Sequence, residues 1–247
     1  MEKKLFDEKL AKCKAKLAKA LADICSALKT DQAKEAFKRS CYVAGGAIWS
    51  TFNEEDPNDY DIFCRNKDDL QIIIKDLGDP DYATDNADTY TMTIGGTGYY
   101  VQFVEATYGT PDKVIEQFDF KHNMFAFDCL GDFFSKDDDF LINKHLVVNE
   151  LNKGDLNTVI CRVPKFCARG FDFSDTQMAE LLLNLKRSGG IDEDVLNGVL
   201  ENAGYDPRSF DDYDDQPYDH VEPDRRVGES HSPTDDEKED LFREEKK

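Results

Sequence analysis

The chain has 247 residues, of which 40% are hydrophobic, and this is enough for one sizeable domain or two small ones. It contains no uninterrupted apolar run of about twenty residues, and its first residues, MEKKLFDEKL, lack the apolar core of a signal peptide, so we expect a cytoplasmic protein with no membrane partner. Its formal net charge of −21 argues against a surface that binds long nucleic acids over most of its area.

The N-terminal region has the opposite charge balance. Residues 1–40 contain eleven basic and six acidic side chains. Apolar residues recur at steps of three and four over residues 3–29, which predicts an amphipathic helix with lysines on its outer face. These lysines are either solvated or contact a nucleic-acid backbone. Thr30 or Asp31 can cap a second helix that runs to about Arg39.

A glycine pair follows the first predicted strand. Tyr42, Val43 and Ala44 are apolar, and Gly45 and Gly46 come directly after them at the start of a short predicted helix. Adjacent glycines allow a sharp turn and let a ligand approach the backbone, and the first N–H groups of a helix favour phosphate. The sequence therefore predicts a phosphate-binding turn.

Two aspartates follow on the next predicted strand. Asp59 and Asp61 are two residues apart, so their side chains face the same way. Carboxylates this close repel each other unless a cation lies between them, and oxygen ligands suit Mg²⁺ that carries substrate phosphates. Solvated surface is the alternative, but the combination with the glycine turn favours a site of metal-assisted phosphoryl or nucleotidyl transfer.

Residues 68–77 predict a helix, with a strand as the alternative because three isoleucines are adjacent. A hairpin should follow, with strands at Tyr90–Ile94 and Tyr99–Ala106 joined by the glycine-rich residues 95–98. Glu105 is the one acid on the second of these strands. It either lies at an exposed strand end or joins the aspartate pair as a third carboxylate that binds metal or activates a hydroxyl.

The later segments are predicted to be mostly helical. A helix begins at Pro111, and residues 140–149 predict two short strands or one kinked strand. Arg162, Lys165 and Arg169 share one helix face, where they bind an anion or pair with neighbouring acids. Ser174 can cap a helix that runs to Arg187, and a last helix is expected from Asp192 to Ala203.

No cysteine or histidine cluster has the spacing of a zinc site. The seven cysteines are scattered without C-x-x-C pairs, which is typical of reduced and mostly buried thiols. His122 has no metal-type partner nearby in the sequence, so we expect it at the surface or hydrogen-bonded. Residues 206–247 hold sixteen acidic and seven basic side chains with few aliphatic ones, which predicts a disordered acidic tail.

Three segments resemble a known superfamily. The glycine pair followed by D-x-D resembles the nucleotidyltransferases related to DNA polymerase β, poly(A) polymerases and CCA-adding enzymes. QFDFKHNMFAFD is similar to the R-R-D-F-T-I-N-A segment of CCA-adding enzymes at Asp119, Phe120, Asn123 and Ala126. RVPKFCARGF is similar to their neck signature, R-x-x-R-F-A-A-R-x-G-F. The resemblance spans about residues 36–180, and the three blocks occur in the family's order.

The resemblance implies an α+β fold: a nucleotidyltransferase core with a mixed sheet flanked by helices in residues 1–150, a small helical domain in 151–205 and the acidic tail in 206–247. It implies transfer of NMP from a bound NTP, with Mg²⁺ or Mn²⁺, to an RNA 3′ end or to a protein or small-molecule hydroxyl. Compact forms of this core occur in bacteriophages. The implied metal-binding and catalytic residues are Asp59, Asp61 and Glu105, and the implied nucleotide-binding residues are Gly45, Gly46, Ser50, Asp119, Asn123, Arg162, Lys165 and Arg169.

The chain also departs from the CCA-adding pattern. Trp49 and Ser50 stand where the family's G-G-x-V-R-D segment has Arg and Asp, and Gln117 and Phe118 replace a pair of arginines. The long helical body that measures tRNA is absent from the sequence. We therefore do not expect CCA addition itself, and a catalytically inactive binding or regulatory protein with the same fold is the alternative.

Overall fold

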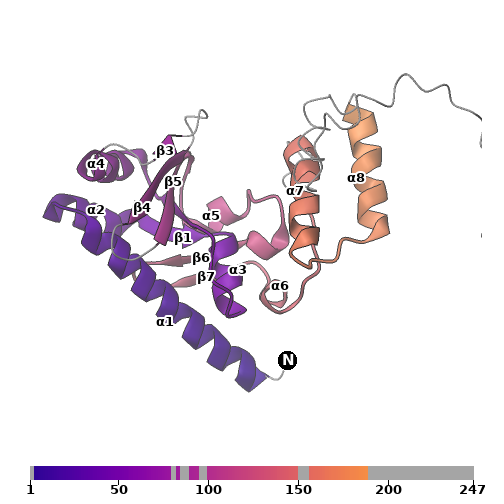
Figure 1. Ribbon diagram of the computed structural model, residues 1–247, viewed down its shortest axis with the longest axis horizontal. Helices are drawn as coiled ribbons and strands as arrows, with labels where there is room; N and C mark the ends of the chain where they lie inside the picture. Colours follow the sequence, from indigo (N-terminus) through magenta and orange to yellow (C-terminus); the bar gives the residue numbers. More distant parts are fainter. Residues whose placement is uncertain (1–2, 79–81, 84–88, 95–98, 150–155, 189–247) are drawn as a thin grey trace, which may run out of the picture. The chain divides into compact units, whose positions relative to one another are not determined.

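The computed structural model describes residues 3–78, 82–83, 89–94, 99–149 and 156–188, and within them one seven-stranded sheet has the order β3-β4-β5-β2-β1-β6-β7 (Figure 1). Its strands are β1 (Cys41–Ala44), β2 (Tyr60–Cys64), β3 (Tyr82–Ala83), β4 (Thr89–Ile94), β5 (Tyr99–Tyr108), β6 (Phe125–Asp128) and β7 (Phe133–Ser135). Strands β2 and β5 pair in parallel, and the other neighbours pair antiparallel. The sheet is therefore mixed, as predicted.

Helices flank this sheet on both faces. They are α1 (Lys3–Ala27), α2 (Asp31–Ser40), α3 (Gly46–Phe52), α4 (Lys67–Leu77), α5 (Pro111–Ile115), α6 (Asp139–Ile142), α7 (Leu156–Ala168) and α8 (Asp175–Ser188), with a 3₁₀ turn, η1, at Lys121–Asn123. Helices α1 and α2 cover one face, and α5 packs on the other against β1, β6 and β7 (Figure 1). Among the described residues, no helix combines the length and the apolar character that a bilayer span requires.

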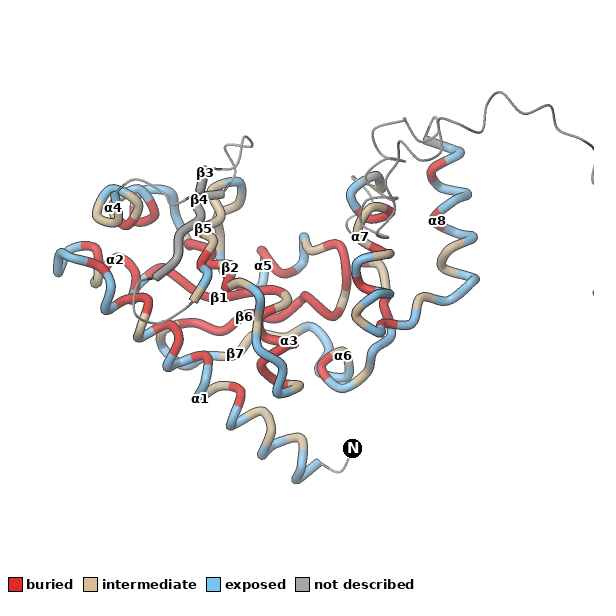
Figure 2. The backbone as a smooth tube through the Cα atoms, in the orientation of Figure 1, coloured by how far each residue is buried: buried red, intermediate tan, exposed pale blue. Residues whose placement is uncertain are grey.

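Strand β1 lies inside the sheet, between β2 and β6, and its residues are buried (Figure 2). Because strand side chains alternate, Cys41 and Val43 join the core beneath α1 and α2, whereas Tyr42 and Ala44 join the cluster under α5. This double burial fixes the position of the residues that follow β1.

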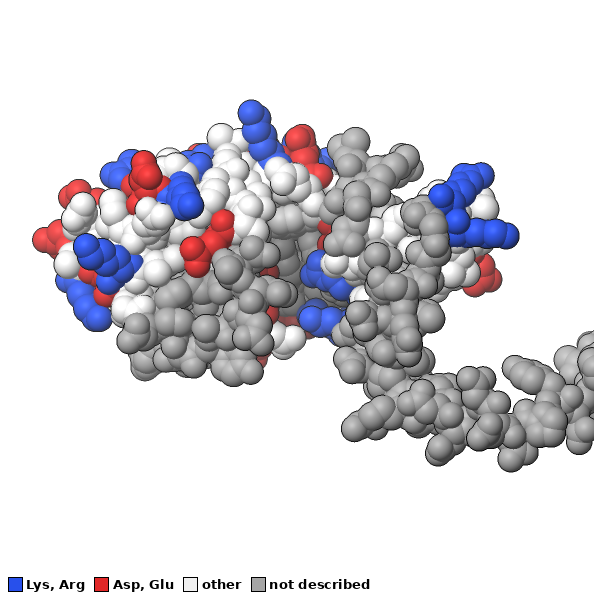
Figure 3. Space-filling model, turned by 90° about the horizontal axis from the view of Figure 1, so that it is seen from above, with Lys and Arg blue, Asp and Glu red and all other residues white. Residues whose placement is uncertain are grey.

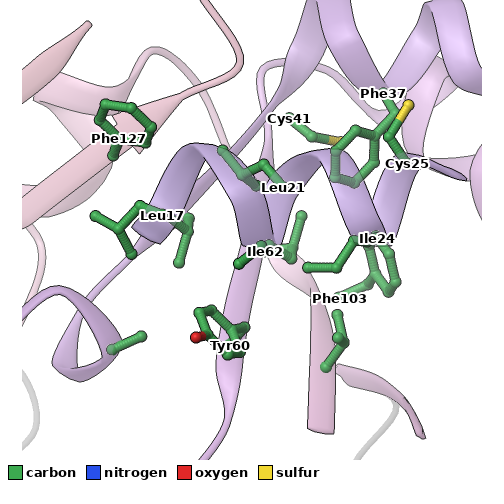
Figure 4. Packing of buried hydrophobic residues seen from close by; sticks show 14 of the residues in the cluster. Leu17, Leu21, Ile24, Cys25, Phe37, Cys41, Tyr60, Ile62, Phe103 and Phe127 are labelled. Carbon is green, nitrogen blue, oxygen red and sulfur yellow. The ribbon is translucent and has the colours of Figure 1, made fainter. Parts of the chain in front are cut away.

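The larger core forms where the apolar stripe of α1 meets the sheet (Figure 4). Leu17, Leu21 and Ile24 of α1 pack with Ile62 and Phe103 from the neighbouring strands β2 and β5. All five side chains are almost completely removed from solvent, and each contributes on the order of 1.5–3 kcal/mol through burial. The predicted periodicity of the first helix is thus confirmed as a core-facing stripe.

Local signals explain the next helices. The Thr30 side-chain oxygen accepts a hydrogen bond from the Ala33 N–H at 3.2 Å and so caps α2. Residues 68–77 are helical, as predicted, but Asn66 caps α4 by accepting from the Asp69 N–H at 2.9 Å. Asp68 is an exposed residue of the first turn.

The strand prediction for residues 140–149 is wrong. Asp139–Ile142 form the short helix α6, helped by the Asp137 side chain, which accepts from the Asp139 N–H at 3.0 Å. The rest of the segment makes only isolated bridges, at His145 and Val148. The glycine-rich hairpin turn at 95–98, the domain boundary at 150–151, the last predicted helix and the acidic tail all lie outside the described residues.

Helices α7 and α8 pack on a second apolar cluster that they share with the core. Trp49 of α3 and Phe120 contribute from the core, and Val163, Phe166 and Leu185 contribute from the two helices. The Trp49 and Phe171 ring centroids lie 4.8 Å apart. This cluster holds α7 beside the segment that follows α5.

Candidate nucleotide site

A cavity of about 270 Å³ opens where β1 ends and α3 begins. Its lining combines the glycine turn, one aspartate of the D-x-D pair, the segment after α5 and one side of α7: Gly45, Gly46, Asp61, Phe63, Val104, Gln117, Phe118, Asp119, Asn123, Thr158 and Arg162. Figure 3 shows basic side chains at the edge of a hollow on one face of the molecule, with a few acidic atoms visible beside them. Two segments predicted separately from the sequence, 45–61 and 119–162, therefore meet in one cavity.

Gly45 makes the turn between β1 and α3 with a φ of +85°, a conformation that other residues rarely adopt. A Cβ atom at this position would lie 3.8 Å from Asp61 Oδ2 and 3.7 Å from Phe118 Cε2. A Cβ at Gly46 would lie 3.7 Å from Asn123 Oδ1. The two glycines thus leave room for a ligand to reach the backbone between the acidic and the aromatic walls.

Asp61 projects from β2 into this cavity, and Asp59 precedes the same strand by one residue. Burial and, to a smaller extent, the neighbouring Asp59 carboxylate raise the pKa of Asp61 to about 7, although Arg162 and Lys165 act in the opposite direction. The Asp59 carboxylate thus acts on Asp61, although Asp59 lies just before β2, and not on it as predicted, and is not part of the cavity lining. A divalent cation would relieve this repulsion, and two carboxylates are suitable oxygen donors for Mg²⁺ or Mn²⁺.

The structure does not bring Glu105 to the aspartate pair. In the parallel pairing of β2 with β5, Asp61 lies beside Gln102, so Gln102 and Val104 share its face of the sheet, and Val104 lines the cavity. Glu105 lies where the register shifts and is not part of the lining. Within the described part of the chain, no three His, Cys, Asp or Glu side chains are grouped to hold a metal ion. A third carboxylate from β5 is therefore not assembled here.

Asp119 and Arg162 form an ion pair across the cavity, with Arg162 Nη1 2.5 Å from Asp119 Oδ2. The Asp119 side chain is only 7% exposed, so its charge is stabilised mainly by this arginine. Asn123, on the 3₁₀ turn, is buried, and within the described residues its Oδ1 has no hydrogen-bond partner. An unpartnered buried oxygen next to Gly46 is available to accept a hydrogen bond from a ligand.

The other predicted nucleotide-binding residues lie outside the lining. Lys165 is exposed on α7, close enough to lower the pKa of Asp61. Arg169 follows the end of α7 and donates a hydrogen bond to the Ser50 hydroxyl at 3.4 Å. The residues of the predicted cationic face are thus separated: Arg162 lines the cavity, whereas Arg169 contacts α3.

His122 is buried, which differs from the prediction of a surface or hydrogen-bonded residue. Its ring packs between Phe166 and Phe171, with centroids 4.5 and 4.4 Å away, and in the described structure neither ring nitrogen has a hydrogen-bond partner. Burial lowers the pKa of His122 to about 3, with smaller contributions from the nearby arginines Arg162 and Arg169. The imidazole is therefore neutral and acts as an apolar ring.

Sequence reasoning missed several residues that shape the cavity. Phe63 and Phe118 form an aromatic wall, with centroids 5.5 Å apart, and Thr158 lies on α7. Asn149, which is 4% exposed, was not singled out, although it contacts the segment that carries Asp119. Isolated polar or aromatic residues at these positions give no local signal, because their role depends on contacts between distant segments.

Solved structures with the same fold are CCA-adding enzymes. A Thermotoga maritima CCA-adding enzyme complexed with tRNA matches with 17% identity and a TM-score of 0.53, over 78% of this chain and 54% of that chain. A CCA-adding enzyme complexed with ATP (19%, TM-score 0.54) and an apo form (20%, TM-score 0.53) match over 71% of this chain and 47% of theirs. The molecule therefore has the nucleotidyltransferase fold and spans about half the length of these structures.

The family follows from a second comparison. The model of the Gabija anti-defense 2 (Gad2) family matches residues 15–146, and the chain belongs to this family. This range includes the glycine turn, the aspartate pair and the segment with Asp119 and Asn123. No curated protein matches the chain significantly.

Proposed function

We propose that this protein is a nucleotidyltransferase that uses Mg²⁺ or Mn²⁺ to move an NMP from an NTP to an acceptor hydroxyl. The observation that carries the proposal is the cavity in which a glycine turn with positive φ lies beside Asp61, whose pKa is raised to about 7 by burial and by Asp59. An acid shifted in this way is a candidate functional group because a bound cation would restore its charged form.

Each residue has a role that follows from its place. Gly45 and Gly46 would receive the β- and γ-phosphates along the backbone, and Asp59 and Asp61 would hold the cation. Bound there, the cation would polarise the phosphate and stabilise developing charge. Arg162, Asp119 and Asn123 would orient the nucleotide, with Lys165, Arg169 and Ser50 supporting the same side.

The reaction is a displacement at the α-phosphorus. The acceptor oxygen forms a bond to the α-phosphorus while the bond to the bridging oxygen breaks and pyrophosphate leaves. The acceptor proton passes to solvent water, because the aspartate pair is engaged in holding the cation. Glu105 is given no role, because Gln102 and Val104, and not Glu105, share the face of the sheet on which Asp61 lies.

The acceptor would be an RNA 3′ end or a hydroxyl of a protein or small molecule in the cytoplasm. The similar CCA-adding structure holds tRNA, but this chain spans about half of it and has Gln117 and Phe118 where CCA-adding enzymes have arginines. An anti-defense role, as named in the family description, is consistent with modifying a component of the host, and a bacteriophage would be the source.

The second candidate is a nucleotide-binding regulatory protein that transfers nothing. It is favoured by the lost arginines and because, among the described residues, no third carboxylate joins Asp59 and Asp61 in a metal-binding group. The family description fits this candidate equally, since an anti-defense protein can act by binding.

A labelling experiment separates the two. The protein is incubated with Mg²⁺, each α-labelled NTP in turn, and total RNA or cell lysate, beside an Asp59→Ala/Asp61→Ala variant. The matched control, Asp7→Ala/Glu8→Ala, removes two exposed carboxylates from α1. Label transfer by the wild type and the control but not by the aspartate variant supports the enzyme. Absence of transfer from every NTP, with NTP binding retained, supports the regulatory protein.

A further inference from the structure

Asn149 makes three hydrogen bonds to one short segment. Its Nδ2 donates to the carbonyl oxygens of Glu116 and Phe118, both at 2.8 Å, and its backbone N–H donates to the Asp119 carbonyl at 2.7 Å. The side chain is buried at 4% exposure. A single residue thus serves three backbone acceptors within four consecutive residues.

The segment that Asn149 holds has no regular secondary structure of its own. It connects the end of α5 at Ile115 to the 3₁₀ turn that starts at Lys121. Backbone carbonyls outside regular secondary structure need donors from elsewhere where they are buried, and leaving a buried one unpaired costs about 1–3 kcal/mol. The segment runs from the exposed Glu116 through the half-buried Phe118 to the buried Asp119. The hydrogen bond from the Lys121 N–H to Val147 O at 2.9 Å continues the same contact along the neighbouring segment.

This segment forms one wall of the cavity. Phe118 lies 3.7 Å from the position of a Cβ on Gly45, and Asp119 pairs with Arg162. Asn149 itself does not line the cavity. A shift of the segment would therefore move the aromatic wall and the arginine together, without any change in the residues that face the ligand.

We propose that Asn149 is a positioning residue of the nucleotide site: it fixes the backbone of 116–119 and thereby the places of Phe118, Asp119 and Arg162. The inference rests on the proposed function only in taking a nucleotide as the ligand. The amide group is required because two N–H donors must reach two carbonyl oxygens at once. An aspartate of the same shape would present oxygen to both carbonyls and repel them.

The test compares Asn149→Asp with Asn53→Asp. Asn53 is a matched control because its Nδ2 also donates to two carbonyl oxygens, those of Trp49 at 2.9 Å and Leu141 at 3.0 Å, and it does not line the cavity. The measurements are the affinity for each Mg²⁺-NTP by titration calorimetry, the thermal midpoint, and amide hydrogen exchange across residues 116–121.

Both variants should have a lower thermal midpoint than the wild type. Only Asn149→Asp should weaken NTP binding, by about tenfold or more. It should also speed amide exchange at 116–119 by about tenfold relative to the control. Equal binding losses in the two variants, or exchange at 116–119 that matches the control, would overturn the inference. If the wild type binds NTP but transfers no label, the enzymatic proposal fails and this one stands. If the wild type binds no NTP, the nucleotide role fails, and the exchange result decides whether Asn149 holds the segment.

Discussion

Ala44 of β1 lies directly opposite Asp61 of β2 in the antiparallel pairing of the two strands. This register places the carboxylate beside Gly45, the next residue along β1, at the point where the chain turns into α3. The glycine turn and the acid are therefore held together by strand pairing and not by a side-chain contact. Four predictions follow from this arrangement and from the groups around it.

Gly45→Ala should reduce both stability and nucleotide binding. Alanine is strained at a φ of +85°, by about 1–3 kcal/mol, and its methyl group would meet Asp61 and Phe118 at the cavity. Gly131→Ala is the matched control, since Gly131 has a φ of +90° and no atom within 4 Å of the added carbon. Urea unfolding should show losses in both variants, and calorimetry should show weaker NTP binding only at Gly45. Unchanged binding in Gly45→Ala would contradict a ligand position at the turn.

Asp61 should make the cation-free protein less stable as the pH rises. Its folded-state pKa of about 7 lies above the unfolded value of ~3.9, so the unfolded chain loses this proton first as the pH rises. The folded protein therefore becomes less stable as the pH rises from the lower value to the higher one. The effect is on the order of 1–4 kcal/mol between pH 4 and 7. In urea unfolding without divalent ions, the free energy of unfolding of Asp61→Asn should increase relative to that of the wild type from pH 5 to pH 8. The exposed control Asp56→Asn should show no such increase. Mg²⁺ should stabilise the wild type most at the higher pH.

His122 should destabilise the protein in acid. Its folded-state pKa of about 3 lies below the unfolded value of ~6.5, so the unfolded chain takes up a proton first and stability falls as the pH drops through this window. His122→Phe keeps a ring in contact with Phe166 and Phe171. Its free energy of unfolding should fall less between pH 7 and pH 4 than that of the wild type, by a few kcal/mol at most. His145→Gln changes an exposed histidine and should leave the pH dependence nearly unchanged. Parallel stability curves for wild type and His122→Phe would show that the ring is not protonated on unfolding.

Asp69 should be a structural acid, remote from the cavity. It is buried on α4 and accepts from Arg39 Nε at 3.2 Å and from Asn66 Nδ2 at 3.0 Å, with further hydrogen bonds from Arg39 and Ser40. Asp69→Ala should lower the free energy of unfolding by about 2 kcal/mol, since several donors lose their acceptor. Asp68→Ala, at the exposed neighbouring position, should change it by less than about 0.5 kcal/mol. NTP affinity should be unchanged in both variants, and a selective loss in Asp69→Ala would contradict the assignment.

Features encoded by neighbouring residues could be predicted from the sequence. The apolar stripe of α1, the Thr30 cap of α2 and the strand before Gly45 all depend on spacings of four residues or fewer, and each is found in the structure. The α+β class followed from these elements and from the family resemblance. The predicted roles of the site residues remain predictions, although the structure brings Gly45, Gly46, Asp61, Asp119, Asn123 and Arg162 into one cavity.

Features that depend on distant contacts could not be predicted. The alternation of side chains along β5 could not show that Val101 and Phe103 face the core or that Gln102 lies beside Asp61. His122 is buried because α7 supplies Phe166, a residue 44 positions later in the sequence numbering. The partners of the Asn149 side chain are 33 and 31 residues away. Helix α6 was missed because four residues are too few for a periodic signal.

The interior position of β1 separates the scaffold of the cavity from part of its chemistry. Ala44 pairs with Asp61 on one side and with Ala126 on the other, so a single short strand sets the path of the backbone around the glycines. Gln117 and Phe118, which also line the cavity, come from a separate connection between α5 and η1. Substitutions at these two positions therefore change the chemical character of the cavity wall and leave the strand pairing behind the glycine turn intact.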